Sequence, residues 1–162
     1  MDIEKASQRD LQHDVQELIA RHAELIDDDR LEEWLELFIE DCVYKVISRE
    51  NEDRGMPVAT IFCDSRDMLV DRIVSLRKAN IYPTHHYRHV ISTARITKVA
   101  RDVISAQTNY VIFQTRNDGH TSIYNAGKYV DEIVSGEGGL KFKSKKAVFD
   151  TNRVDTLMVR PV

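Results

Sequence analysis

The second half of the sequence is β-like almost throughout, and this restricts the fold more than any other feature. β-branched and aromatic residues are dense in four long segments, 85–99, 103–116, 121–134 and 140–150. The separators are short and rich in turn-forming residues, most clearly Asn117-Asp118-Gly119. Because short turns join consecutive strands in antiparallel fashion, we expect a meander of long strands. Such a sheet must bury one face against another layer.

The first half of the sequence supplies that layer as three predicted helices. Apolar residues recur at helical spacing from Leu11 to Ile26, and Ser7 with Asp10 forms a capping pattern, so the first helix runs from Ser7 to about Ile26. Similar spacing predicts a shorter helix over 31–38 and a third over 65–79. Between them we expect a strand at 42–49, a polar loop at 50–55 and a short apolar run at 57–63. These elements predict an α+β fold with a curved, mostly antiparallel sheet in a single domain, 1–162.

Size and charge exclude several classes of protein. The 162 residues fit one domain with its own core, and a net charge of -4 provides no basic surface for nucleic acid. No apolar run reaches the length of a membrane span, and the first ten residues lack the apolar stretch of a signal peptide. We therefore expect a cytoplasmic protein, with Cys42 and Cys63 reduced and buried.

The cluster His85-His86-Tyr87-Arg88-His89 is the most suggestive candidate for a metal site. Pro83 before it and the β-branched residues after it favour a strand, where His85, Tyr87 and His89 share one face. On a strand, side chains four positions apart lie roughly 13 Å from each other, too far to share one metal ion. We therefore interpret the cluster as a polar, hydrogen-bonded strand entry.

Other candidate sites have equally plain interpretations. The run Asp27-Asp28-Asp29 is typical of a solvated turn that caps a helix. Neither cysteine has the nearby histidine that a Rieske cluster requires, and no glycine-rich phosphate loop occurs. We therefore predict no catalytic, cofactor-binding or metal-binding residue on this chain.

Several segments, taken together, resemble a known family. The residues from Leu31 to Phe38, the strand 42–49, the segment from Asp64 to Arg72, and Tyr87-Arg88-His89-Val90 are similar to small (beta) subunits of Rieske non-haem iron ring-hydroxylating dioxygenases. The resemblance covers nearly the whole chain. Within the family, Arg49-Glu50-Asn51, Ala79-Asn80-Ile81-Tyr82 and Asp155-Thr156-Leu157-Met158 look most like the terephthalate type, with anthranilate and salicylate types as near neighbours.

This resemblance implies a nuclear-transport-factor-2-like cone and an α3β3 oxygenase in which the chain forms a trimer and supports assembly. It also implies a large (alpha) subunit that carries the Rieske [2Fe-2S] cluster and a mononuclear Fe(II). A reductase or ferredoxin would deliver electrons from NADH, and the complex would cis-dihydroxylate an aromatic, carboxylated ring in aromatic-compound catabolism. The small subunit is itself non-catalytic in this scheme.

The resemblance also singles out a set of mostly charged residues. They are interpreted either as an internal polar network or as subunit contacts, and the sequence leaves both open: Arg49, Asp64, Arg66, Asp67, Asp71, Arg72, Tyr87, Arg88 and His89.

Two other functions stay open. The first is a stand-alone isomerase or dehydratase of the same cone fold, in which Tyr44, His85, His89 and one of Asp27 to Asp29 form the acid–base groups. The second is a small-molecule-binding protein without a partner enzyme.

Overall fold

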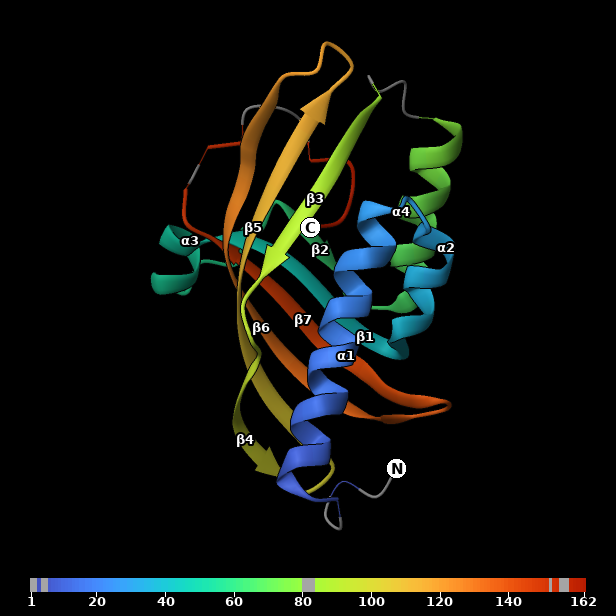
Figure 1. Ribbon diagram of the computed structural model, residues 1–162, viewed down its shortest axis with the longest axis vertical. Coiled ribbons are helices and arrows are strands. Elements are labelled where there is room, and N and C mark those ends of the chain that lie inside the picture. Colours follow the sequence, from blue (N-terminus) through green and yellow to red (C-terminus); the bar gives the residue numbers. More distant parts are fainter. Residues whose placement is uncertain (1–2, 4–5, 80–83, 152, 155–157) are drawn as a thin grey trace.

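A seven-stranded sheet curves around helix α1, with the shorter helices at its margins (Figure 1). The computed structural model describes residues 3, 6–79, 84–151, 153–154 and 158–162. In chain order its elements are α1 (Gln8–Asp27), α2 (Leu31–Trp34), the 3-10 turn η1 (Leu35–Leu37), β1 (Phe38–Ser48), α3 (Arg49–Asp53), β2 (Ile61–Cys63), α4 (Arg66–Lys78), β3 (His85–Ile91), β4 (Arg95–Ala100), β5 (Val103–Arg116), β6 (Thr121–Gly136) and β7 (Gly139–Phe149).

The strands follow the order β2-β1-β7-β6-β5-β3, and β4 also pairs with β5. Every pairing is antiparallel except that of β1 with β7, which is parallel. The predicted α+β class, with a curved and mostly antiparallel mixed sheet, is therefore confirmed. The parallel pair joins the first long strand to the last and lies inside the open sheet, between β2 on one side and β6 on the other.

Helix α1 begins where the sequence predicts. The Ser7 hydroxyl accepts a hydrogen bond from the Asp10 backbone N–H at 3.2 Å and donates to the Asp10 carboxylate at 2.7 Å. Its apolar positions, including Val15, Ile19 and Ile26, are fully buried against the concave face of the sheet. Helix α4 likewise matches its prediction, with Ser65 as its N-cap.

Two predictions for the middle of the chain were wrong. The helical segment predicted at 31–38 is present as α2 followed by η1, but β1 begins at Phe38, four residues before the predicted strand start. The predicted polar loop at 50–55 is largely helix α3. Its first turn is capped by the Ser48 hydroxyl, which accepts from the Asn51 N–H at 3.3 Å.

The predicted segment 85–99 forms two strands rather than one. Between β3 and β4, the backbone of Ala94 bonds to helix α1 instead of to β5: its carbonyl accepts from Gln12 Nε2 at 2.7 Å, and its N–H donates to Gln16 Oε1 at 2.7 Å. Polar side chains of the helix therefore interrupt the strand and fix its approach to α1.

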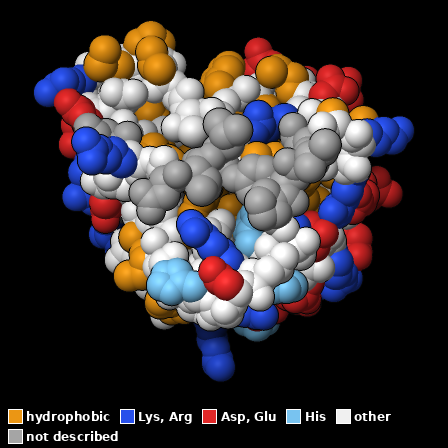
Figure 2. All heavy atoms as spheres, turned by 90° about the horizontal axis from the view of Figure 1, so that it is seen from above, with side chains coloured by type: hydrophobic (Ala, Val, Ile, Leu, Met, Phe, Trp, Pro, Cys, Tyr) orange, Lys and Arg blue, Asp and Glu red, His pale blue; other side chains and the backbone are white. Residues whose placement is uncertain are grey.

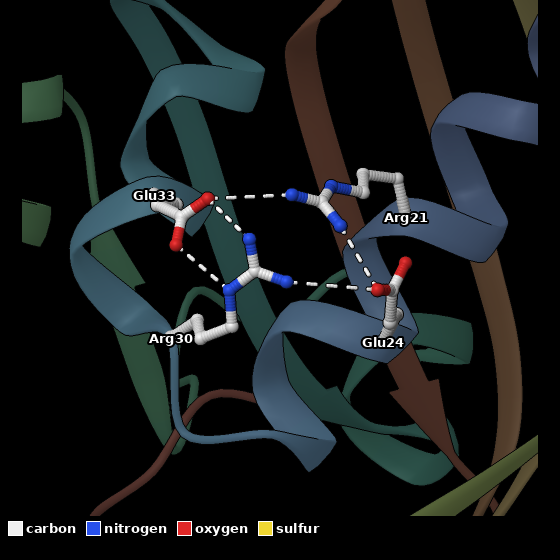
Figure 3. Close-up of polar contacts among 4 residues, drawn as sticks. All are labelled: Arg21, Glu24, Arg30 and Glu33. Carbon is white, nitrogen blue, oxygen red and sulfur yellow. Dashed lines mark hydrogen bonds and ion pairs between the residues drawn. The ribbon is translucent and has the colours of Figure 1, made fainter.

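Surface ion pairs join the end of α1 to the start of α2. Arg21, Glu24, Arg30 and Glu33 form a closed ring of two cations and two anions (Figure 3), with contacts of 2.6 to 3.6 Å. Their side chains are 38 to 54% exposed, so each pair adds little to stability. Seen from above (Figure 2), the end of the molecule carries scattered charges of both signs, with histidines on one side and large hydrophobic groups at the opposite edge.

Candidate functional site

The concave interior of the sheet contains a buried carboxylate–imidazole pair. Asp27, the last residue of α1, accepts two hydrogen bonds from His89 of β3: one from the backbone N–H at 2.8 Å and one at ring Nδ1 at 2.6 Å. The Asp27 side chain is 5% exposed and the His89 ring is fully buried. Such a pair orients an imidazole and holds its proton on Nδ1, which leaves Nε2 as the acceptor. Within the described chain, Nε2 has no hydrogen-bond partner.

The interpretation of Asp27-Asp28-Asp29 as a solvated turn is wrong for two of the three residues. Asp27 turns inward to His89. Asp29 adopts a left-handed backbone conformation (φ 59°) and pairs with Arg77 at 2.8 Å and Arg160 at 3.3 Å. Only Asp28 is exposed, as the prediction requires. The acidic run therefore joins α1 to β3, to α4 and to the C-terminal residues.

A second buried pair lies deeper in the interior and was missed by sequence reasoning. Lys145 of β7 and Asp131 of β6 are opposite each other in register, 3.2 Å apart, and both side chains are fully buried. The ammonium group also lies 3.9 Å from the centre of the Tyr129 ring. Burial raises the pKa of Asp131 and lowers that of Lys145, while their mutual attraction opposes both shifts. The signal available in the sequence was one charged residue at an otherwise apolar, inward-facing position in each of the two strands.

His22 connects this pair to the helices. Trp34 Nε1 donates to His22 Nδ1 at 2.7 Å, and the imidazole packs edge-on against Tyr129 and Phe142. Burial, aided by the charge of Lys145, lowers the pKa of His22 well below its ordinary value. The surroundings of His22 thus favour its neutral form.

The residues singled out by the resemblance lie in three separate places. Tyr87 and His89 are inside the cone, where Tyr87 stacks on Tyr124 with ring centres 5.0 Å apart. Arg88, next to them in sequence, is 70% exposed, 3.8 Å from the Asp27 carboxylate. Arg49 pairs with Asp150 at 2.6 Å where β1 meets α3.

The remaining members of that set surround the start of α4. Arg66 pairs with Glu36, and Asp64, Asp67 and Asp71 are exposed. Arg72 lies beside Tyr44 and Ile73 at the wall of a small cavity. The structure therefore does not gather the predicted set into one site.

Of the acid–base groups considered for a stand-alone enzyme, Asp27 and His89 come together. His85 packs on Tyr87, and the Tyr44 hydroxyl is bonded to the backbone of Val162. Burial raises the pKa of the Tyr44, Tyr110 and Tyr129 hydroxyls, so none is a base near neutral pH. The prediction for the cysteines is confirmed: both are buried and unbonded, and burial raises the pKa of Cys42 to about 11.

Among the residues that the structure describes, no group of three or more His, Cys, Asp or Glu side chains is placed to hold a metal ion. No described helix has the length and apolar character needed to cross a bilayer.

Comparison with known proteins identifies the family. Residues 21–156 match the model of the ring hydroxylating beta subunit family. The small subunit of anthranilate 1,2-dioxygenase from Burkholderia cepacia is 46% identical over 137 residues, 85% of each chain. The terephthalate 1,2-dioxygenase terminal oxygenase subunit beta 2 from Comamonas is 36% identical over 143 residues, 88% of this chain and 93% of that one. We predicted that the motifs look most like the terephthalate type, but of these two relatives the anthranilate subunit shares more residues with the chain.

Structural comparison agrees. A crystal structure assigned as the beta subunit of an aromatic-ring-hydroxylating dioxygenase from Novosphingobium aromaticivorans superposes with a TM-score of 0.87, at 47% identity over 95% of this chain and 98% of that one. The predicted cone of the nuclear-transport-factor-2 type is also confirmed, since more distant neighbours of the scytalone dehydratase type share the fold. The chain belongs to the ring hydroxylating beta subunit family.

Proposed function

We propose that this chain is the small, non-catalytic subunit of a multicomponent aromatic-ring-hydroxylating dioxygenase, an oxidoreductase that acts only as a complex. The observation that carries the proposal is the family match over 136 of 162 residues, residues 21 to 156 inclusive. The named relatives are small or beta subunits of dioxygenases, at identities up to 46%. The interior supports a structural role as well, because His22, Asp27, Asp131 and Lys145 are each bonded to another buried side chain.

The proposed partner is a large oxygenase subunit that holds the Rieske [2Fe-2S] cluster and the mononuclear Fe(II). Electrons would reach it from NADH through a reductase or ferredoxin, and the assembly would be an α3β3 hexamer built on a trimer of this chain in the cytoplasm. Symmetric closed assemblies are the rule among soluble oligomers. The substrate proposed is a carboxylated aromatic ring, converted to a cis-diol, since anthranilate and terephthalate name the enzymes of two relatives.

The residues that the resemblance singled out include some with an internal role and some that we propose as subunit contacts. Tyr87 and His89 belong to the internal network, as their burial and contacts suggest. Asp64, Asp67 and Asp71 are exposed and have no cationic partner in the described chain, so we propose them as subunit contacts. Unpaired surface charges of this kind steer association and select partners.

Co-expression with the large subunit tests the assignment. We expect a complex with equal numbers of the two subunits whose mass corresponds to α3β3, and ring oxidation when reductase and NADH are added. The chain purified alone should oxidise no aromatic substrate. Turnover by the isolated chain, or failure of the two subunits to co-purify, would contradict the proposal.

A charge-reversal variant tests the proposed contacts. Asp67→Lys with Asp71→Lys should reduce recovery of the complex, most clearly at low salt. Glu137→Lys, in the exposed turn between β6 and β7, is the matched control and should leave recovery unchanged. If the complex is recovered equally well with both variants, Asp67 and Asp71 do not contact the large subunit.

A further inference from the structure

The last described residues, Met158 to Val162, run into the cone rather than along its surface. Val162 is fully buried, and both of its backbone polar groups bond to one side chain: Tyr44 Oη donates to the Val162 carbonyl at 2.9 Å and accepts from the Val162 N–H at 3.0 Å. Pro161 is buried beside it. We call residues 158–162 the tail segment. In Figure 1 the C-terminus lies at the centre of the molecule, over the sheet.

A single outer contact fixes the tail segment on the helix side. Arg160 reaches Asp29 at 3.3 Å, and Asp29 is itself held by Arg77. The Arg160 side chain is 16% exposed. The tail segment is therefore anchored at two points, one in the interior and one at the α1–α2 corner.

The walls beneath the tail segment have the composition of a ligand site. Trp34 of α2 and Tyr44 of β1 provide aromatic surface, and Leu69 and Ile73 of α4 provide aliphatic surface. Arg72 completes the wall, and its guanidinium has no carboxylate partner in the described part of the chain. Val159 and Pro161 fill the space so fully that a cavity of only about 10 Å³ is left.

An aromatic surface with one unpaired guanidinium and one hydroxyl fits a particular chemistry. The ring of a monocyclic aromatic acid would pack against Trp34 and the aliphatic wall, and its carboxylate would accept from Arg72 and from Tyr44 Oη. Small-molecule sites are generally of this kind, mostly apolar with a few placed polar groups. Val159, Pro161 and Val162 together occupy more space than such a ligand requires.

We propose that the tail segment is a tethered plug in a pocket for a monocyclic aromatic carboxylate, formed by Trp34, Tyr44, Leu69, Arg72 and Ile73. Ligand and tail segment compete for the pocket, so the apparent affinity of the intact chain is the pocket's own affinity reduced by the small fraction of molecules with the tail segment displaced. Any change that loosens the tail segment therefore raises apparent affinity.

The test uses the full chain, with benzoate as the probe, titrated calorimetrically and by the fluorescence of Trp34, which is the only tryptophan in the sequence. Arg160→Ala removes the outer anchor without touching the pocket, and should bind benzoate several-fold more tightly than the unmodified chain. A variant ending at residue 157 should bind at least about ten-fold more tightly. Adding Arg72→Gln to either variant should abolish binding, and benzamide, which lacks the charge, should bind more weakly than benzoate.

Two results would overturn the proposal: equal benzoate affinity of the intact chain and Arg160→Ala, or binding that survives Arg72→Gln. Arg160→Ala keeps the test valid if the shortened variant fails to fold. The proposal is independent of the subunit assignment, because absence of benzoate binding leaves co-purification with the large subunit unaffected.

Discussion

At the scale of single residues, four pairs of buried polar groups stabilise the interior of the cone, and the members of each pair come from different helices, strands or terminal segments. Asp27 bonds to His89, Lys145 to Asp131, Trp34 to His22, and Tyr44 to Val162. A buried polar group with a good partner costs little, but one whose partner is removed costs the full loss of hydration. The interior is therefore sensitive to single changes and tolerant of paired ones.

Removal of the Asp27 carboxylate should show this sensitivity. Asp27→Ala leaves both the ring N–H and the backbone N–H of His89 buried without an acceptor, and we expect a loss of about 2 to 4 kcal/mol in the free energy of unfolding. Urea denaturation measures it. Asp28→Ala, at the exposed neighbouring position, should change stability by less than about 0.5 kcal/mol. Equal effects at the two positions would show that the pair with His89 contributes nothing.

The pair Lys145–Asp131 permits a sharper comparison. Lys145→Met alone leaves a carboxylate uncompensated in the core and should cost about 3 to 5 kcal/mol. The double variant Lys145→Met with Asp131→Leu should recover most of that loss, because two apolar side chains of similar size replace two desolvated charges. A double-mutant cycle from thermal or urea unfolding gives the coupling energy. Strictly additive losses would contradict coupling between the two side chains.

His22 makes stability depend on pH. Its folded-state pKa is lowered well below the ordinary value of 6.5, so between those two values the unfolded chain binds a proton that the folded chain does not. The free energy of unfolding therefore falls as the pH drops below about 6.5, by up to about 1.4 kcal/mol per pH unit from this group. His22→Asn, which retains an acceptor for Trp34, should lose that part of the slope between pH 7.5 and 5.5. An unchanged slope would assign the acid sensitivity to other groups.

At the scale of elements, the sequence predicts the bounds of a helix or strand best where its periodic pattern is long and no tertiary contact competes with it. Helix α1 and strand β5 match their predicted bounds to within a residue, because their periodicity agrees with their tertiary surroundings. The errors fall where a tertiary contact overrides a local pattern. The residues after Ile91 have β propensity, yet the backbone of Ala94 bonds to the side chains of Gln12 and Gln16. These side chains lie 78 or more positions away, so the local sequence cannot indicate them.

Strand β6 contains one position that only glycine can occupy. A Cβ atom built on Gly127 would lie 2.1 Å from the Val148 carbonyl oxygen and 2.8 Å from Phe149 Cα, both of them backbone atoms of β7. Gly127→Ala must therefore separate β6 from β7, and we expect a loss of about 3 kcal/mol or more, or no folded protein. Gly119→Ala, in an open turn with φ 82°, meets only the backbone penalty of about 1 kcal/mol. Similar melting temperatures for the two variants would contradict the close approach of the strands.

At the scale of the whole molecule, the alternation of β3 correctly predicted that Tyr87 and His89 share one face of the sheet, and the structure shows that this is the inner face. It could not supply the partner of His89, since Asp27 lies 62 positions earlier and its position in an acidic run is typical of solvated turns. The same holds for Tyr44 and Val162, 118 positions apart. Sequence patterns thus indicate which side chains share a face of a strand. The pairs that make up the site depend instead on which distant segments the tertiary fold brings together.

The sequence separation of the paired strands β1 and β7 predicts how fast the chain folds. The parallel pairing of β1 with β7 joins residues 38–48 to 142–149, so a loop of roughly 100 residues must close before this pair forms. We therefore expect refolding in milliseconds to seconds, in the range of proteins dominated by long-range strand pairing. Trp34 packs on Phe38 of β1, and Phe38 packs on Phe142 of β7, with ring centres 4.7 and 5.3 Å apart. Stopped-flow fluorescence of Trp34 therefore reports this junction through Phe38. Completion of the Trp34 signal in microseconds would mean that the junction forms from local contacts before β7 arrives.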